Sequence, residues 1–250
     1  MTGTEKTTIA SFLDLAGDHL AGGYKRPRAE YTFNDDHHNS LEAAAADVAA
    51  DIAACERCGL CKTRTRTVPG EGVTRPLVMV IGEGPGADED VSGRPFVGKA
   101  GQLLDRMLDS RGKIGLSRTK NCYIANIVKC RPPGNRNPQQ DEITACVPFL
   151  TRQIKILAPK IILAAGNTAA KTLLDSTEGI TRLRGTFTTF KGTLLMDGDF
   201  NIPLLPTYHP SALLRDDSLK APVWEDLKKL RFKLCELDPG YAAEMADRPL

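Results

Sequence analysis

Three polar residues of this 250-residue chain stand beside apolar segments, where side chains could act on a ligand. The first is Glu83, within the loop Gly82-Glu83-Gly84-Pro85-Gly86. The glycines permit tight turning and a close approach of the backbone to a ligand, and the N–H groups of such a loop can bind an anion or a carbonyl oxygen. The alternative for this loop alone is a strand–helix turn with a solvated glutamate.

Asn126 and His209 complete the group. Asn126 lies near the end of the apolar run 123–128, and a buried amide needs partners for both its donor and its acceptor. His209 follows the apolar run 202–207 after Tyr208 and is the only histidine beyond residue 38. Taken singly, each is compatible with a structural role. Together with Glu83 they place three polar groups at the ends of apolar runs, which indicates a shared site.

Five of the seven cysteines fall into a pattern that suits metal binding: Cys55, Cys58, Cys61, Cys130 and Cys146. An odd number of cysteines, in a chain with no recognisable export signal, argues against structural disulfides. A C-x-x-C pair with two distant thiolates suits a four-thiolate site that joins remote segments. Zinc and a [4Fe–4S] cluster both have this ligand count, and the wide spacing disfavours a zinc ribbon. The remaining two, Cys122 and Cys235, are predicted to be ordinary buried thiols.

The elements that position these residues follow from hydrophobic patterning. Short apolar runs predict buried strands at 77–81, 123–128, 160–165 and 202–207. Helical patterns alternate with them at 41–54, 101–108, 139–157 and 222–234. This alternation predicts an α/β fold, in which helices cover both faces of a parallel sheet. Ligands bind beyond the carboxyl ends of such strands, where Glu83, Asn126 and His209 fall.

The composition and the ends of the predicted domain set wider bounds. Residues 1–38 are polar and interrupted by Gly and Pro, so a flexible extension is expected ahead of one domain over residues 39–250, which begins with a helix capped by Asn39. Hydrophobic residues make up 41% and charged residues 26%, as in soluble globular proteins, and no run approaches the ~20 apolar residues of a membrane span. The expected location is cytoplasmic. Residues 1–50 are net acidic and the remainder is net basic, which is compatible with a polyanionic partner.

Three segments carry a family resemblance: GEGPGADEDVSGRPFVGKAG, NIVKCRPPGNRNP and YHPSALLR. In this order, and with the cysteine pattern, they resemble the family 4 uracil-DNA glycosylases, the iron–sulfur branch of the uracil-DNA glycosylase superfamily. The resemblance covers roughly residues 50–235. It implies a three-layer α/β/α fold around a four-stranded parallel sheet, a [4Fe–4S] cluster, and base excision repair by hydrolysis of the N-glycosidic bond of uracil. The implied partner is uracil-containing DNA, single- or double-stranded, bound by a monomer associated with the nucleoid.

The resemblance also implies roles for individual residues. Glu83 would position or activate the attacking water, and His209 would stabilise charge that develops on uracil O2. The substrate-binding residues would be the loop glycines against O2, the aromatic that stacks on the flipped base, and the amide that reads the uracil edge: Gly82, Gly84, Gly86, Phe96 and Asn126. The wall that rejects the thymine methyl is expected near 88–90. The cluster ligands would be Cys55, Cys58, Cys130 and Cys146, with Cys61 able to replace one of the first two.

DNA contacts are expected from basic residues and from the segment that follows His209. The candidate cations are Lys129, Arg131, Arg136, Arg182, Arg184 and Arg215, of which about half are expected to touch phosphate. Ser211, Leu213 and Leu214 complete the expected DNA-binding surface. The two leucines either insert into the gap left by the flipped base or belong to the core.

Two alternatives to a repair enzyme stay open. One is a uracil-DNA-binding or covalent-trapping protein of the same superfamily with little turnover. A histidine in an extra loop between the third and fourth cysteines performs the trapping in a sister group, and residues 131–145 contain neither, which favours turnover. The other is an iron–sulfur or zinc module, redox or structural, without glycosylase activity. The acidic extension could in addition recruit a replication or repair protein.

Overall fold

The computed structural model describes residues 35–109, 112–193, 198, 200–248 and 250, and Asn39–Leu250 forms one compact unit. Nearly all of the expected extension over residues 1–38 lies outside the described residues, so its flexibility stays a prediction. The first described helix, α2, begins at Asp35, ahead of the start predicted at Asn39.

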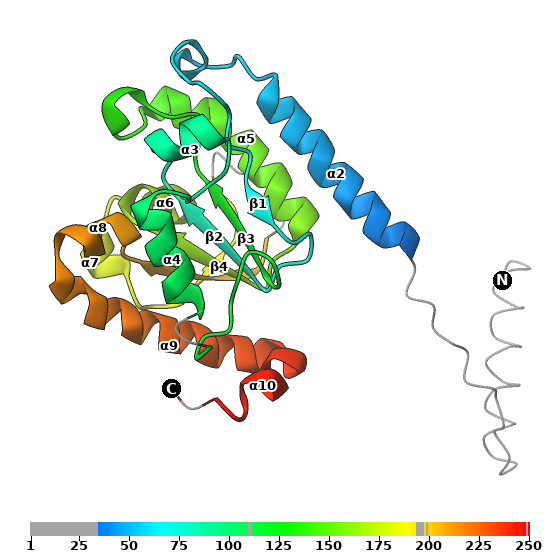
Figure 1. Cartoon of the computed structure of the whole chain (residues 1–250), viewed down its shortest axis with the longest axis vertical. Helices are drawn as coiled ribbons and strands as arrows, with labels where there is room; N and C mark the ends of the chain where they lie inside the picture. Colours follow the sequence, from blue (N-terminus) through cyan, green and yellow to red (C-terminus); the bar gives the residue numbers. More distant parts are fainter. Residues whose placement is uncertain (1–34, 110–111, 194–197, 199, 249) are drawn as a thin grey trace, which may run out of the picture. The chain divides into compact units, whose positions relative to one another are not determined.

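Within the described residues, a mixed sheet of six strands lies at the centre of the unit, in the order β1-β3-β2-β4-β6-β5 (Figure 1). The four central strands run parallel, as the sequence predicted. Two short antiparallel edge strands, β1 and β5, extend the sheet. The strands are β1 (Glu71–Gly72), β2 (Val78–Gly82), β3 (Cys122–Asn126), β4 (Ile161–Ala165), β5 (Thr188–Phe190) and β6 (Ile202–Thr207).

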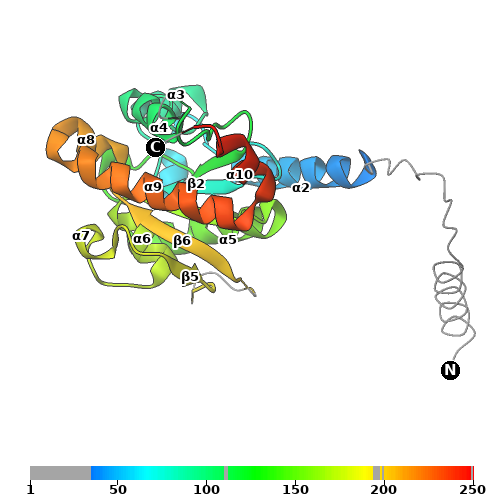
Figure 2. The same ribbon diagram turned by 90° about the horizontal axis from the view of Figure 1, so that it is seen from below.

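Helices cover both faces of this sheet and make the three layers that were expected. Figure 2 shows α4 and α9 on one side of the strands and α5 and α6 on the other. The helices are α2 (Asp35–Ala53), α3 (Ala87–Ser92), α4 (Lys99–Asp109), α5 (Gln140–Leu157), α6 (Asn167–Leu174), α7 (Ile180–Leu183), α8 (Pro210–Arg215), α9 (Lys220–Leu237) and α10 (Pro239–Met245), with 3-10 turns η1 (Gly59–Lys62), η2 (Pro133–Asn135) and η3 (Asp217–Leu219).

Strand β2 shows why its run of apolar residues is continuous. Its side chains alternate between two hydrophobic cores, with Met79 and Ile81 in the core on the α5 side and Val78 and Val80 in the core on the α9 side. All four are fully buried. A strand covered on both faces needs an apolar residue at every position, which is the pattern that identified it.

The parallel register brings the strand ends to one edge of the sheet. Gly82 at the end of β2 pairs with Asn126 at the end of β3, and Ala165 of β4 pairs with Thr207 of β6. The residues that continue from these ends therefore start from a common edge. In the part of the chain that is described, none of the helices is long and apolar enough to cross a membrane.

Candidate active site

A cleft of about 570 Å³ opens at the carboxyl edge of the sheet. Glu83 from the end of β2, Asn126 from the end of β3 and His209 from the end of β6 all line it. Phe96, from the loop before α4, also lines the cleft, as do Gly84 and Gly86. The structure therefore brings together the side chains that the sequence assigned to one site, although they lie far apart in the chain.

Asn126 offers the cleft a buried acceptor without a partner. Asn126 is 1% exposed. Among the described residues, its Oδ1 is the one buried side-chain polar atom that lacks a hydrogen bond. Such an atom costs ~1–3 kcal/mol unless a ligand satisfies it. A Cβ at Gly82 would lie 2.5 Å from this oxygen and 2.6 Å from Cζ of Phe96, so only glycine admits both side chains beside β2. Within this part of the chain, Oδ1 does not make the backbone bond that a purely structural role would require.

His209 is a neutral imidazole of defined tautomer. Its Nδ1 accepts a hydrogen bond from the Ser211 N–H at 3.2 Å and lies 2.8 Å from the Ser211 hydroxyl. The ring proton is therefore on Nε2. Burial lowers the pKa of His209 to about 4, and the positive charge of Arg215 acts in the same direction. At neutral pH the site thus holds an uncharged hydrogen-bond donor, and its ring centroid lies 5.4 Å from that of Phe96.

Glu83 is held by a residue that the sequence did not single out. The Thr168 hydroxyl, near the start of α6, donates a short hydrogen bond to Oε2 of Glu83. This bond fixes one carboxylate oxygen by a group from the neighbouring strand–helix connection. Thr168 follows a strand end, as the three predicted residues do, but a threonine in the first turn of a helix has no sequence feature that distinguishes it.

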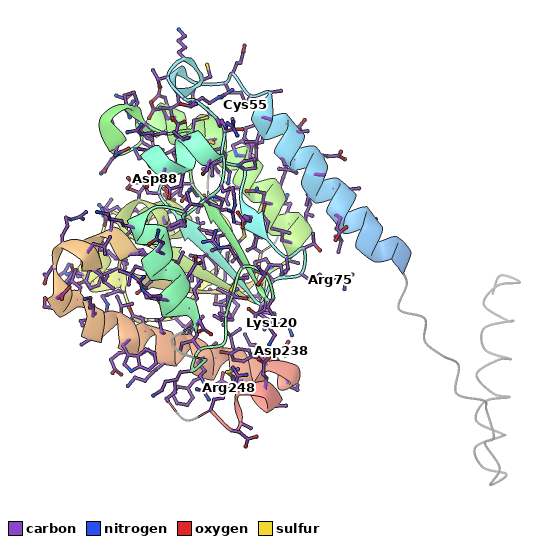
Figure 3. All side chains as sticks on the ribbon, in the orientation of Figure 1. Cys55, Arg75, Asp88, Lys120, Asp238 and Arg248 are labelled. Atoms are coloured by element: carbon purple, nitrogen blue, oxygen red, sulfur yellow. The ribbon has the colours of Figure 1, made fainter. Side chains whose placement is uncertain are left out.

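Glu89 is a second residue of the cleft that was not named individually. Its carboxylate accepts hydrogen bonds from the N–H groups of Gly86 at 3.1 Å, Val97 at 2.8 Å and Gly98 at 2.9 Å, and so joins the loop after β2 to the loop that carries Phe96. Glu89 belongs to the segment 88–90, where the wall against a thymine methyl was expected, and it lines the cleft. Asp90 of that segment is instead buried and accepts from the Thr65 N–H at 2.8 Å. Figure 3 shows Asp88 on the same short helix, α3.

The rim of the cleft carries some of the predicted DNA contacts. Arg136, Arg215 and Ser211 line it. The guanidinium of Arg136 makes two hydrogen bonds to Glu142, at 2.8 and 2.6 Å, and Arg131 Nε donates to the Asn135 side chain at 2.8 Å. The Ser211 hydroxyl faces His209, so this residue orients the imidazole from within the cleft.

The prediction that Leu213 contacts DNA is wrong, and the structure separates it from its neighbour. Leu213 is 2% exposed and packs in the core on the α9 side. Leu214 is 48% exposed on the same helix, α8. Adjacent residues of a helix point about 100° apart, so one belongs to the core and the other to the surface.

Of the six candidate cations, Lys129 was predicted wrongly, and Arg184 is engaged in an ion pair. Lys129 is 1% exposed, and its ammonium donates to the Asn126 carbonyl at 2.8 Å and to Gln153 Oε1 at 2.7 Å. Burial lowers the pKa of Lys129 to about 8. Arg184 forms an ion pair of 2.5 Å with the fully buried Asp226. The Lys129 side chain is buried, whereas the Arg184 side chain is 20% exposed and held by its ion pair. Sequence alone does not distinguish such residues from a basic surface.

A second, smaller cavity is lined by all five cysteines of the metal-binding pattern: Cys55, Cys58, Cys61, Cys130 and Cys146. Cys55 lies just beyond α2 (Figure 3). Among the described residues, no three Cys, His, Asp or Glu side chains lie close enough to hold a metal ion. Zinc would need four ligands about 2.0–2.3 Å from one point. The five thiols therefore line one cavity without forming a single-ion site among the described residues.

The cavity also supplies hydrogen bonds to sulfur. Arg64 Nη1 donates to the Cys130 sulfur at 3.3 Å, and the Lys129 backbone N–H donates to the Cys146 sulfur at 3.2 Å. Burial raises the pKa of the Cys146 thiol to about 11 and also raises that of Cys130. Neither Cys122 nor Cys235 lines this cavity; Cys122 is fully buried, as predicted, whereas Cys235 is only partly so.

Comparisons with known proteins agree with this geometry. Residues 69–228 match the Uracil DNA glycosylase superfamily. The chain is 43% identical over 185 residues to the type-4 uracil-DNA glycosylase of Sulfurisphaera tokodaii, a match that covers 72% of this chain and 80% of that protein. It is 41% identical over 187 residues to the type-4 uracil-DNA glycosylase of Thermotoga maritima, with 74% and 91% covered. A type-5 uracil-DNA glycosylase of Pyrobaculum aerophilum is 28% identical over 161 residues, with 59% and 67% covered.

Proposed function

The chain belongs to the type-4 uracil-DNA glycosylases, and we propose that it removes uracil from DNA in base excision repair through the residues of the strand-end cleft. The observation that carries the assignment of these residues is the partnerless Oδ1 of Asn126, which faces the same cleft as a carboxylate and a neutral imidazole. An orphaned buried acceptor calls for a ligand N–H, and uracil offers one at N3.

Base recognition begins with extrusion of the nucleotide, because a base inside a duplex cannot reach the cleft. Oδ1 of Asn126 accepts from uracil N3–H while its amide nitrogen donates to O4. Cytosine has an acceptor at N3 and a donor at C4, so both pairings fail. Phe96 stacks on the base, which is worth ~1–3 kcal/mol. Glu89, fixed by three backbone N–H groups, supplies the wall against the C5 methyl of thymine.

Bond cleavage leaves positive charge on the sugar and negative charge on the departing uracil. His209 stabilises the negative charge, because its Nε2–H donates a hydrogen bond to uracil O2. Ser211 fixes the other ring nitrogen, Nδ1. One preorganised donor of this kind is worth ~2.7–4 kcal/mol in the transition state. Glu83, held by Thr168, orients the attacking water and stabilises the sugar cation.

The cysteine cavity is proposed to hold a [4Fe–4S] cluster. Cys130 and Cys146 provide two ligands, and Cys55 and Cys58 provide the others, with Cys61 as the alternative to either. When bound, the cluster joins the segment after α2 to the segment after β3 and to α5. The N–H groups of Arg64 and Lys129 that point at the sulfurs suit thiolates that carry negative charge. Iron content and a brown colour of the purified protein test this assignment.

The DNA backbone is proposed to cross the rim at Arg136 and Arg215 and to pass the half-buried Arg131, with Leu214 at the gap left by the flipped nucleotide. Arg182, 80% exposed in its side chain, is a further candidate.

The deciding experiment measures uracil release from single- and double-stranded DNA by the wild type and by Glu83→Ala. We expect kcat to fall about 10²–10⁴-fold, with DNA affinity nearly unchanged, because the carboxylate acts on the reaction rather than on binding. Glu225→Ala, at an exposed position of α9, is the matched control and keeps wild-type rates. Equal losses of turnover and binding in Glu83→Ala would contradict the role of Glu83. A persistent protein–DNA adduct on a denaturing gel, in place of an abasic product, would contradict turnover itself.

A further inference from the structure

Phe96 has a backbone conformation that an aromatic residue rarely adopts. Its φ is +52°, in the left-handed region, where a side chain with a Cβ is strained. Residues held in this way need surrounding groups that fix the chain. Among the described residues with a positive φ other than glycine, Phe96 and Asn135 both line the cleft, and the Phe96 ring faces His209. The groups that hold its peptide therefore bear on the site.

Arg118 provides the most extensive of these contacts. Its Nη1 donates to the Pro95 carbonyl at 2.9 Å and its Nη2 donates to the Phe96 carbonyl at 3.0 Å. A planar guanidinium holds two adjacent carbonyls through two nitrogens in a fixed fork, whereas a lysine has a single nitrogen on a flexible stem. Arg118 lies in the connection before β3 and outside all three motifs that carry the family resemblance.

Arg118 is itself fixed in place. Its guanidinium forms an ion pair of 2.8 Å with Asp105 on α4 and lies 3.8 Å from Glu71 on β1. The side chain is only 11% exposed, so solvent competes little for its hydrogen bonds.

The opposite side of the same loop is closed by other groups. The Glu89 carboxylate accepts from the N–H groups of Val97 and Gly98. The Phe96 carbonyl lies so close to α4 that a Cβ on Gly101 would be 1.9 Å from its oxygen. Arg118 thus holds the carbonyls of this loop and Glu89 holds its N–H groups. The close contact with Gly101 fixes the backbone between them. This leaves the ring pressed against β2 at Gly82.

We propose that Arg118 is a positioning residue for uracil recognition, which keeps the Phe96 backbone left-handed so that the ring stands ready to stack on the flipped base. The inference rests on the stacking role of Phe96 in the proposed function. Without the guanidinium, two carbonyls lose charge-assisted hydrogen bonds and Phe96 can relax to an unstrained conformation, which turns its ring out of the cleft.

A double-mutant cycle separates this role from a general contribution to the fold. The kcat/KM for uracil release is measured for the wild type, Arg118→Met, Phe96→Ala and the combined variant. We expect Arg118→Met to lower kcat/KM about tenfold, the effect of ~1.4 kcal/mol of lost transition-state stabilisation. In the Phe96→Ala background the same change should have less than about a twofold effect, because the ring that Arg118 positions is gone.

Inhibition by free uracil gives a second measurement, since it reports on the base pocket without DNA. The inhibition constant should rise in Arg118→Met by a factor similar to the loss of kcat/KM. Arg94→Met is the matched control, because Arg94 also pairs with Glu71, at 2.8 Å, and its side chain is 60% exposed. That variant should keep wild-type kcat/KM and wild-type inhibition by uracil.

Each result assigns a cause. If Phe96→Ala equals the wild type, the stacking role in the proposed function fails. If Phe96→Ala loses activity and Arg118→Met does not, or if the two losses multiply in the combined variant, the positioning role of Arg118 is overturned. Should Arg118→Met not fold, Arg118→Lys replaces it in the cycle. Lysine keeps the charge near Asp105 and lacks the two-carbonyl fork, so a smaller loss that again vanishes with Phe96→Ala is expected.

Discussion

One short segment of the chain contributes to both sites, because Asn126 lines the strand-end cleft and Cys130 lines the cysteine cavity. The two sites nevertheless hold their polar groups differently. In the cleft, protein groups orient the side chains. Ser211 fixes the tautomer of His209, and Thr168 fixes one oxygen of Glu83. In the cysteine cavity, the sulfurs of Cys130 and Cys146 each accept one hydrogen bond from an N–H group. The thiols line a cavity.

The difference teaches which site is complete without its ligand. A cleft built on strand ends has its geometry set by sheet register and by hydrogen bonds, so it can be organised before the base arrives. A cavity lined by thiols from the segment after α2, from the segment after β3 and from α5 gains its main cross-link only when a cluster binds. Substitutions of the cysteines should therefore lower the stability of the whole fold, and substitutions in the cleft should lower the rate of uracil release.

The largest effect is expected from Cys146→Ala, which removes a thiol that α5 supplies to the cavity. The variant should lose bound iron, and its Tm should fall by about 10 °C or more, because cluster-binding energy contributes directly to folding. Iron analysis and thermal unfolding of the purified protein measure both.

Cys235→Ala is the matched control, since this thiol on α9 lies outside the cavity. It should retain iron and change Tm little. Cys61→Ala sharpens the assignment further: retention of the cluster leaves Cys55 and Cys58 as ligands, and loss makes Cys61 one. Full iron content in Cys146→Ala would contradict the proposed difference between the two sites, because the cavity would then not be the cluster site.

The next largest effect is the pH dependence of stability that His209 contributes from the cleft. The pKa of His209 is about 4 in the folded protein, against an ordinary value of 6.5, because the ring is buried. As pH falls below 6.5 the unfolded chain takes up a proton and the folded chain does not, so stability that is complete above pH 6.5 is lost on acidification towards pH 4. The loss approaches roughly 3 kcal/mol.

Urea unfolding at pH 7 and pH 4.5, for the wild type and His209→Gln, measures this contribution. The glutamine variant lacks the titrating group, so its free energy of unfolding should fall less between the two pH values. The same acid dependence in both proteins would show that His209 is not buried as a neutral ring.

These residues also show how far sequence reasoning reaches. The central strands were predictable because continuous apolar runs such as 78–81 arise only when both faces are covered. The convergence of Glu83, Asn126 and His209 on one cleft was predictable because parallel strand ends share an edge. The contacts of Thr168 and Arg118 were not, since they depend on which loops meet in space. Lys129 and Leu213 were placed wrongly, because a cation or a leucine at a given position carries no sign of whether it faces inward.

A smaller change is expected when the orphaned acceptor of the cleft is removed. Asn126→Leu replaces a buried amide, whose Oδ1 has no partner among the described residues, by an apolar group of similar volume. The free energy of unfolding should stay level or rise by ~1 kcal/mol, because the desolvation cost of the acceptor disappears. Uracil release should nevertheless fall strongly, as the base loses both edge contacts. A loss of stability larger than 1 kcal/mol, measured by urea unfolding, would instead assign Asn126 a structural role.

The smallest effect is expected at the rim, where Leu214→Ala and Leu213→Ala form a matched pair on one helix. Leu214 is exposed, so its removal should change stability by no more than ~0.5 kcal/mol. It should slow uracil release from double-stranded DNA by up to about tenfold and leave single-stranded DNA unaffected, because only a duplex closes the gap behind a flipped base. Leu213→Ala should lose ~2–5 kcal/mol of stability through a core cavity and show no strand preference. Equal losses on both DNA forms in Leu214→Ala would place this leucine outside the wedge, and the cleft would then extract the base through the contacts of the pocket alone.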